Sequence, residues 1–372
     1  MEEYERIYCY ESLYQAHKLA RKGKQNTREV ILYEMRLSEN IERLSYHLRQ
    51  HTYRVRGYRK FRIYDPKERE IQALCYGDRI VQHSLCDNVL GPYLEKRLIY
   101  DNSACRKGKG THFAISRLTA FLREYGRKYG TEGYILKCDV RKYFASIDHT
   151  VLKGKISRMA LSEEVRWLLE IIIDSYESES GKGLPMGNQT SQWFALYYLD
   201  GLDRLVKEKL RIKYYTRYMD DMILIHSDRN YLKECLQEME CFLSGELKLA
   251  FNEKTQIHPI RQGVDYLGFH FYLTETGKVV RTLRQSSKKR LKRRLRNYRH
   301  AYAEGKMELE AISRSVAGCK GHLKHAHTYR LQKNIWKNFR LKRKDSEEEN
   351  KHENEEENKH ENEEENKHEN KE

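Results

Sequence analysis

The fold of this chain is constrained most by an acidic dipeptide that lies between two short β-prone runs. Asp220-Asp221 follows residues 214–218 and precedes residues 222–225, and both runs are rich in apolar or aromatic side chains. Such runs favour β-strands, and a short break between two of them is typical of a hairpin. The sequence therefore predicts a hairpin that carries two carboxylates at its turn.

Another acidic residue stands at the end of a short apolar run. Residues 133–138 precede Asp139, and a loop and an amphipathic stretch follow it. This pattern predicts a core strand that ends at a carboxylate. Helical patterns, including residues 192–205, lie between this strand and the hairpin, so the sequence predicts an α+β fold.

Asp139, Asp220 and Asp221 are suited to chemistry at phosphate. Nucleotidyl transfer needs an activated 3′-oxygen and a neutralised pyrophosphate, and two divalent ions roughly 4 Å apart do both. Mg²⁺ prefers carboxylate oxygen with room left for water and phosphate, so aspartates from separate strands are the expected ligands. Adjacent aspartates on a surface turn are often turn residues only, and spacing alone favours that alternative.

The charge of the chain is divided unevenly. The tail Asp345–Glu372 holds 14 acidic residues against 4 lysines, a net charge of −10, so residues 1–344 must carry +26 to give the chain's total of +16. A body this basic, with 28 tyrosines, fits a partner with a dense line of negative charge, and nucleic acid is the first candidate. The alternative is a solvated basic surface with no such partner.

Cysteine usage and hydropathy exclude several classes. The eight cysteines include no C-x-x-C pair, so neither a zinc ribbon nor a disulfide framework is predicted. The first residues are acidic and lack an apolar signal region, and no stretch approaches the length that spans a bilayer. We therefore expect reduced thiols, a cytoplasmic location and no membrane partner.

Five segments stand in a fixed order along the chain. They are Tyr76-Gly77-Asp78-Arg79-Ile80-Val81-Gln82-His83, Asp139-Val140-Arg141-Lys142-Tyr143-Phe144, Tyr218-Met219-Asp220-Asp221, Leu249-Ala250-Phe251-Asn252-Glu253-Lys254-Thr255 and Val264-Asp265-Tyr266-Leu267-Gly268-Phe269. In that order they resemble the D-R-I/V-V-x-H segment of bacterial reverse transcriptase fingers, the first aspartate motif, the Y-x-D-D hairpin, the lysine-bearing motif and the primer-grip segment. The resemblance covers roughly residues 50 to 275. It implies an RNA-directed DNA polymerase with a right-hand architecture.

The resemblance also assigns roles to single residues. It implies that Asp139 and Asp220 ligate two Mg²⁺ ions, for which Mn²⁺ can substitute. It places Asp221 in support of them and lets the Val140 carbonyl complete the site. Lys254 would stand near the leaving pyrophosphate, where an ammonium group can neutralise charge or donate a proton.

Three further residues would contact the incoming nucleotide. By resemblance, Phe144 lies under the sugar and excludes a 2′-hydroxyl, although an aromatic residue there could equally belong to the core. Lys67 and Arg69, beyond a basic hairpin predicted at residues 53–64, would reach the triphosphate. Plain surface charge is the alternative for both.

One segment indicates a subfamily. Gly183-Leu184-Pro185-Met186-Gly187-Asn188-Gln189-Thr190-Ser191-Gln192 differs from many reverse transcriptases, which carry Gln where Met186 stands and Pro where Gln192 stands. This form, with Met186, Gly187 and Gln192 at the substrate, resembles the enzymes of diversity-generating retroelements, as does the segment 102–111. Those enzymes copy a template repeat RNA while misincorporating opposite adenines, in mutagenic retrohoming. An apolar, flexible Met could loosen selection against mispairs.

The resemblance implies partners and leaves alternatives open. Expected partners are template RNA, an RNA/DNA hybrid, deoxynucleoside triphosphates and a small basic accessory protein. A retron-like or phage-defence reverse transcriptase is one alternative. A catalytically inactive RNA-binding scaffold is another, although the three aspartates, Phe144 and Lys254 are all present.

Composition and resemblance together predict five segments. They are an N-terminal helical extension (1–50), fingers (51–132), a palm with a ferredoxin-like antiparallel sheet (133–270) that includes a fingers insertion at about 150–185, a basic helical thumb (271–344) and a disordered acidic tail (345–372). In the thumb, the run Lys288–Arg296 is either a solvated helix face or a patch that binds nucleic-acid backbone. In the tail, Glu-Glu-Glu-Asn-Lys-His-Glu-Asn repeats three times from Glu347 without an apolar residue.

Overall fold

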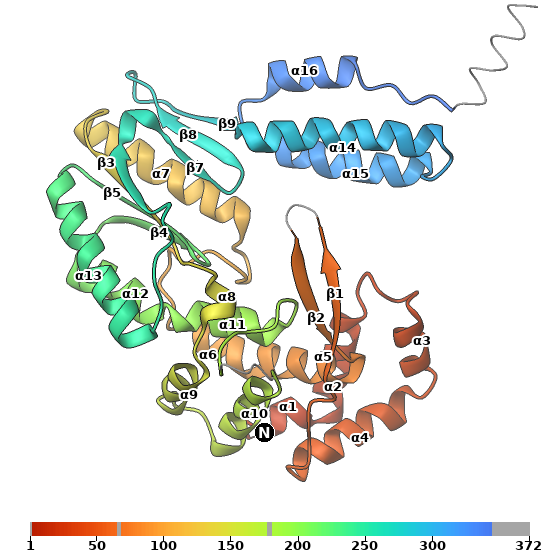
Figure 1. Cartoon of the computed structure of the whole chain (residues 1–372). Helices are drawn as coiled ribbons and strands as arrows, with labels where there is room; N and C mark the ends of the chain where they lie inside the picture. Colours follow the sequence, from red (N-terminus) through yellow and green to blue (C-terminus); the bar gives the residue numbers. More distant parts are fainter. Residues whose placement is uncertain (1, 65–67, 177–180, 344–372) are drawn as a thin grey trace, which may run out of the picture. The chain divides into compact units, whose positions relative to one another are not determined.

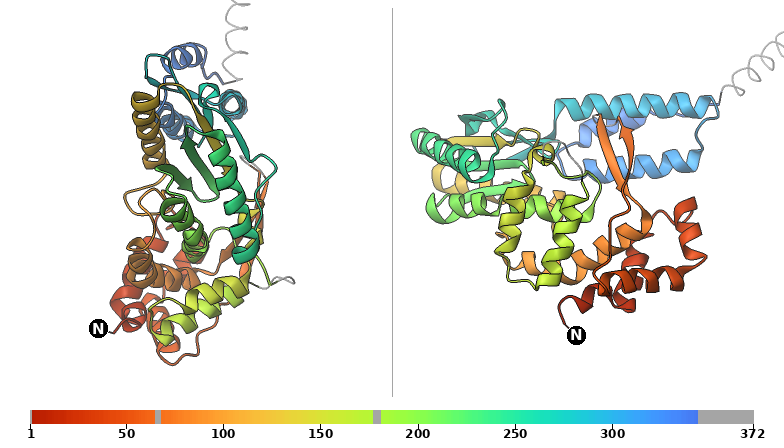
Figure 2. Two further views of the ribbon diagram at one scale, coloured as in Figure 1. Left: turned by 90° about the vertical axis from the view of Figure 1, so that its left-hand side faces the viewer. Right: turned by 60° about the horizontal axis from the view of Figure 1, so that its bottom comes forward.

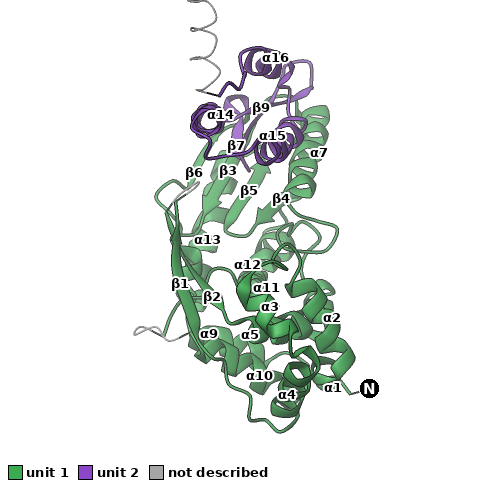
Figure 3. Cartoon of the chain, turned by 90° about the vertical axis from the view of Figure 1, so that its right-hand side faces the viewer, with its two compact units in different colours: residues 1–260 green, residues 261–372 purple. Residues whose placement is uncertain are grey.

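The computed structural model describes residues 2–64, 68–176 and 181–343. The chain divides into two compact units, Met1–Ile260 and Arg261–Glu372 (Figure 3). The predicted triphosphate contact Lys67, and the acidic tail lie outside the described residues.

The N-terminal segment is helical, as its pattern predicts. It forms α1 (Glu5–Tyr8), α2 (Tyr10–Ala20), α3 (Arg28–Glu34) and α4 (Leu37–Arg49). Apolar residues that recur at three- to four-residue steps, such as Leu13, Val30 and Ile41, are buried, as expected for amphipathic helices. All four helices contact α5 (Tyr76–Leu85), and Figures 1 and 2 show them gathered around it.

Part of the basic run 53–64 forms one arm of a hairpin. β1 (Tyr58–Ile63) pairs antiparallel with β2 (Arg69–Leu74), and Tyr58 stands opposite Leu74. The middle of β1 is exposed, which agrees with the basic outer positions that the sequence predicts.

A four-stranded antiparallel sheet forms the centre of the first unit. Its strand order is β4 (Tyr214–Tyr218), β5 (Asp221–His226), β3 (Tyr134–Asp139) and β6 (Gln256–Pro259). The predicted strand before Asp139 is β3, and the predicted acidic hairpin is β4–β5. The interior of β5, from Met222 to Ile225, is fully buried, so both faces of this strand are covered.

Helices complete the first unit. They are α6 (Gly91–Glu95), α7 (Thr111–Tyr129), α8 (Tyr143–Ser146), α9 (His149–Ser157), α10 (Glu163–Asp174), α11 (Gln189–Tyr198), α12 (Asp200–Arg204) and α13 (Arg229–Leu247). α7 contacts β4, whereas α13 contacts β3, β5 and β6. Side-chain caps begin two helices at the predicted fingers insertion: Asp148 accepts from the Val151 amide of α9, and Ser162 accepts from the Val165 amide of α10.

The second unit opens with strands, which corrects the prediction that the thumb is helical from residue 271 onward. Its elements are β7 (Val264–Tyr266), β8 (Phe269–Leu273), β9 (Val279–Leu283), α14 (Gln285–Ala303), α15 (Leu309–Leu323) and α16 (Tyr329–Lys337). Phe269, Phe271 and Leu273 alternate with less buried residues, which is the period of a half-buried strand. Gly277, at φ 76°, lies in the β8–β9 connection.

The first compact unit ends at Ile260, ten residues before the palm–thumb boundary predicted at residue 270. The functional domain boundaries stay predictions. Within the described ranges, no helix is both long and apolar enough to cross a bilayer.

Candidate active site

The β4–β5 turn places two carboxylates at one end of the central sheet. Tyr218 and Asp221 are register partners, so only Met219 and Asp220 connect the strands. Met219 has φ 55°, in the left-handed region that a residue with a side chain adopts at an energetic cost. A strained conformation of this kind needs support from the surrounding structure.

The register of β3 and β5 brings the third carboxylate to the same place. Asp139 is the partner of Asp221, and this pair closes the ladder between the two strands. The structure thus brings together Asp139, Asp220 and Asp221 from one strand end and one turn. The sequence predicts this convergence only in outline, because the register is a long-range feature.

Electrostatics shows that the three carboxylates repel one another. Burial raises the pKa of Asp220, and the charge of Asp139 raises it further. Burial also raises the pKa of Asp221 to about 7, while Lys137 lowers it and the other two aspartates raise it. The site therefore has an excess of negative charge that a bound cation would relieve.

A neighbouring strand segment fixes the position of Asp139. Asn252 donates its backbone N–H to the Asp139 carbonyl (2.7 Å) and its side-chain amide to the Asp139 carboxylate (3.3 Å). The backbone N–H of Arg141 donates to the Ala250 carbonyl on the same side. Val140 is buried and forms an isolated antiparallel bridge with Phe251. The role of its carbonyl at the metal site stays a prediction.

The donor set fits a divalent ion that arrives with a nucleotide. In the part of the chain that the structure describes, no three His, Cys, Asp or Glu side chains form a ready-made metal cage. Mg²⁺ at nucleotide sites is held by one or two carboxylates together with phosphates and water. One buried carboxylate oxygen of Asp221, Oδ1, accepts no hydrogen bond, and its ion-pair partner, the Lys137 ammonium, stands 3.6 Å away. This oxygen is available to such an ion.

A fully buried ion pair supports the strained turn from behind. Arg217 of β4 and Asp203 of α12 are both 0 % exposed, and two short hydrogen bonds join them (2.7 and 2.6 Å). The same guanidinium donates to the Met219 carbonyl at 2.8 Å. Burial alone would lower the pKa of Arg217, but the Asp203 carboxylate raises it. A charge inside a β-prone run is the sequence signal that could have found this residue.

The predicted nucleotide-contacting segment runs beside the end of α8. The backbone N–H of Leu184 donates to the Phe144 carbonyl (2.8 Å), and the backbone N–H of Gln72 in β2 donates to the Met186 carbonyl (3.3 Å). Gly187 has φ 120°, and a Cβ there would stand 3.4 Å from Ile71 of β2. Met186 and Gly187 therefore lie against β2, and Phe144 is bonded to the same segment through Leu184.

The remaining predicted residues have different placements. Arg69 of β2 is exposed and lowers the pKa of Asp220, so it lies on the side of the acidic site. Lys254 is exposed, and its backbone N–H donates to the Asn252 side chain at 3.2 Å. Gln192 is half-buried on α11. Sequence reasoning missed Asn252, which stands two residues before the predicted lysine.

An antiparallel sheet that gathers aspartates from a strand end and a hairpin turn is typical of a polymerase palm. Residues 64–271 match the family model described as reverse transcriptase (RNA-dependent DNA polymerase), which is more than half of the chain. The chain belongs to this family. The match confirms the predicted fold class, an α+β fold of the right-hand polymerase type.

Two solved structures are similar at low identity. One is telomerase from Candida albicans in complex with a fragment of telomeric RNA, with a TM-score of 0.46, 11% identity, and coverage of 62% of this chain and 45% of that chain. The other is apo telomerase from Candida tropicalis, with a TM-score of 0.45, 13% identity, and coverage of 63% and 49%. The matched part thus spans about half of each telomerase chain. No curated protein matches the sequence.

Proposed function

We propose that this chain synthesises cDNA from an RNA template by two-metal nucleotidyl transfer. The observation that carries the proposal is the convergence of Asp139, Asp220 and Asp221 at one end of the central sheet, in a chain of the reverse transcriptase family. Reverse transcriptase domains generally use divalent metal ions, and the excess negative charge at this site suits them.

The protein's own groups would bind and orient the reactants. Two Mg²⁺ ions, when bound, supply activation of the 3′-oxygen and neutralisation of the pyrophosphate. Asp139 and Asp220 would hold them, and Asn252 keeps the Asp139 carboxylate in a fixed orientation. Arg69 brings positive charge to the side of Asp220, where the triphosphate would lie. Lys254 would neutralise or protonate the leaving pyrophosphate.

Primer extension by the purified full-length chain tests this proposal. The reaction contains an RNA template, an annealed DNA primer, Mg²⁺ and deoxynucleotides, and a variant with Asp220 replaced by asparagine serves as the control. We expect extension by the natural chain and none by the control. Equal extension by both would contradict the proposal. If neither extends the primer, the proposed basic accessory protein is added before the proposal is abandoned.

Phe144 is proposed to select deoxynucleotides. Its ring is half-buried and edge-on to Tyr143, and its carbonyl holds the segment that contains Met186. A side chain under the sugar leaves no room for a 2′-hydroxyl. Shortening Phe144 to valine should raise the use of ribonucleotides relative to deoxynucleotides by about 10- to 200-fold. Ratios of kcat/KM for matched nucleotide pairs measure this effect, and an unchanged ratio would identify Phe144 as a core residue only.

We further infer that the enzyme is error-prone at template adenines, in a diversity-generating retroelement. The Met186 side chain is half-buried, and the backbone carbonyl of Met186 accepts a hydrogen bond from the backbone N–H of Gln72. The backbone at this position is therefore held in place beside a side chain that offers no hydrogen bond to the nucleotide. A Gln at position 186 would supply a hydrogen bond to the incoming nucleotide, and its absence weakens discrimination against a mispaired nucleotide.

Met186→Gln is expected to reduce misincorporation opposite template adenine by about tenfold, the effect of one hydrogen bond of about 1.4 kcal/mol. Sequencing of cDNA made by the two proteins on one template measures it. Met186→Leu, which keeps the site apolar, is the matched control and should retain the error spectrum. Accurate cDNA from the natural chain would instead favour the retron-like or phage-defence alternative.

A further inference from the structure

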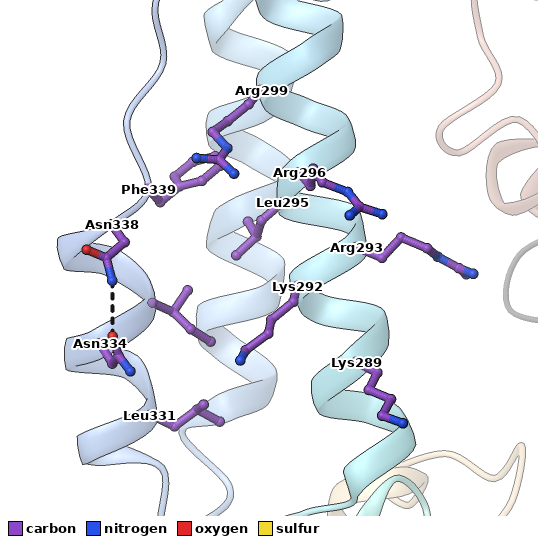
Figure 4. A pocket seen from close by; sticks show the side chains of 11 residues that line it. Lys289, Lys292, Arg293, Leu295, Arg296, Arg299, Leu331, Asn334, Asn338 and Phe339 are labelled. Carbon is purple, nitrogen blue, oxygen red and sulfur yellow. Dashed lines mark hydrogen bonds between the residues drawn. The ribbon is translucent and has the colours of Figure 1, made fainter.

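A basic groove lies between two helices of the second unit. It has a volume of about 530 Å³, and α14 lines it with five cationic side chains, while α16 and the chain after it supply Leu331, Ile335 and Phe339. The cations are Lys289, Lys292, Arg293, Arg296 and Arg299. Figure 4 shows Lys292 pointing toward α16 and Arg293 pointing away from it.

The described part of the chain supplies no anion to the groove. Among the residues that the structure describes, no Asp or Glu lines it, and all five cations are exposed. None of the five forms an ion pair with another residue that the structure describes. Like charges three or four residues apart on one helix repel one another, so binding of a polyanion would relieve repulsion along α14.

The path of the chain supplies a candidate polyanion. α16 ends at Lys337, and the next residues, Asn338 and Phe339, line the groove themselves. Asp345 follows six residues after Phe339 and begins the tail of net charge −10. Six residues reach up to about 20 Å when extended. The acidic segment therefore begins within reach of the groove along the chain.

The length of one acidic repeat also matches the length of the cationic stretch on α14. The basic face from Lys289 to Arg299 covers about 15 Å of helix, and one octapeptide extends to about 26 Å. A single repeat can thus span the face, and the three identical repeats offer three equivalent ways to do so. Tethering through a short linker gives an effective concentration in the mM range, which makes weak charge contacts sufficient.

We propose that the acidic repeats bind the basic groove between α14 and α16 of the same chain and compete there with nucleic acid. The second half of this proposal depends on the proposed function, which makes nucleic acid a substrate of this chain. Each repeat of eight residues holds four glutamates and one lysine. It carries less negative charge per length than nucleic acid, so a hybrid can displace it.

Carbodiimide cross-linking of the full-length chain tests the docking directly. This reagent joins amines to carboxylates that are already in contact. Mass spectrometry should find Lys289 or Lys292 joined to glutamates of residues 347–370, and the exposed Lys233 of α13 should show no such product. A mixture of ¹⁵N-labelled and unlabelled protein separates joins within one chain from joins between copies. Absence of the cross-links, or joins between copies only, would overturn the proposal.

Hybrid binding tests the competition. Replacing the twelve glutamates of the three repeats by glutamine should tighten binding of a short RNA/DNA hybrid by about tenfold at low salt, with a smaller gain at high salt. Replacing His352, His360 and His368 by glutamine leaves the tail charge unchanged and is the matched control. Cross-links together with unchanged hybrid affinity would overturn the competition. Primer extension is measured separately, because its failure would count against the polymerase proposal and not against the docking.

Discussion

Replacing Asp220 by asparagine is expected to slow primer extension by at least about a thousandfold, since loss of a shared metal ligand removes about 4 kcal/mol of transition-state stabilisation. Asparagine keeps the shape of the side chain but loses the charge that would hold the ions. Single-turnover extension at saturating Mg²⁺ and nucleotide measures the chemical step.

Stability separates this catalytic role from a structural one. Burial and the charge of Asp139 both raise the pKa of Asp220, so the folded protein holds this carboxylate in an unfavourable environment. Asp220→Asn removes that repulsion, and we expect the Tm of the metal-free protein to stay the same or to rise. A fall in Tm that parallels the loss of activity would mean that Asp220 maintains the turn rather than the chemistry.

The sequence predicts the acidic site well because its three aspartates stand at the ends of short apolar runs. Asp139 ends an apolar run, and Asp220-Asp221 interrupts two others, so local patterns alone place each carboxylate at a strand end. What local patterns cannot give is the pairing of β3 with β5, since partners such as Asp139 and Asp221 are far apart along the chain. The family resemblance implied that the three carboxylates share one metal site, but not which strands pair.

The sheet of β7, β8 and β9 shows the opposite case. Phe269, Phe271 and Leu273 stand at every second position, which favours a strand, but the strongly basic helix α14 follows closely and the helical prediction extended over both. Asn252 was missed for another reason. Its role depends on hydrogen bonds to a residue 113 positions earlier, and no local pattern reports such a contact.

The pair Arg217–Asp203 is expected to give the largest effect on stability. Arg217→Met should lower the free energy of unfolding by about 3–5 kcal/mol, because it leaves the Asp203 carboxylate buried without its counter-charge. Tyr215 would still donate to that carboxylate, but one hydroxyl cannot replace a guanidinium. Denaturant titration of the two proteins measures the change, and a loss below about 1 kcal/mol would mean that water reaches the pair.

A double variant distinguishes support of the turn from support of the fold. Arg217→Met combined with Asp203→Leu removes both charges, and buried pairs replaced by apolar residues often regain most of the lost stability. The Met219 carbonyl, however, still lacks the donor that the guanidinium provides. We therefore expect stability to recover to within about 2 kcal/mol of the natural chain, whereas extension stays at least about tenfold slower, with kcat affected more than KM. Because both variants carry the same change at residue 217, recovery of stability without recovery of kcat would show that Arg217 positions the turn beside Asp220. Recovery of both would limit the pair to a role in folding.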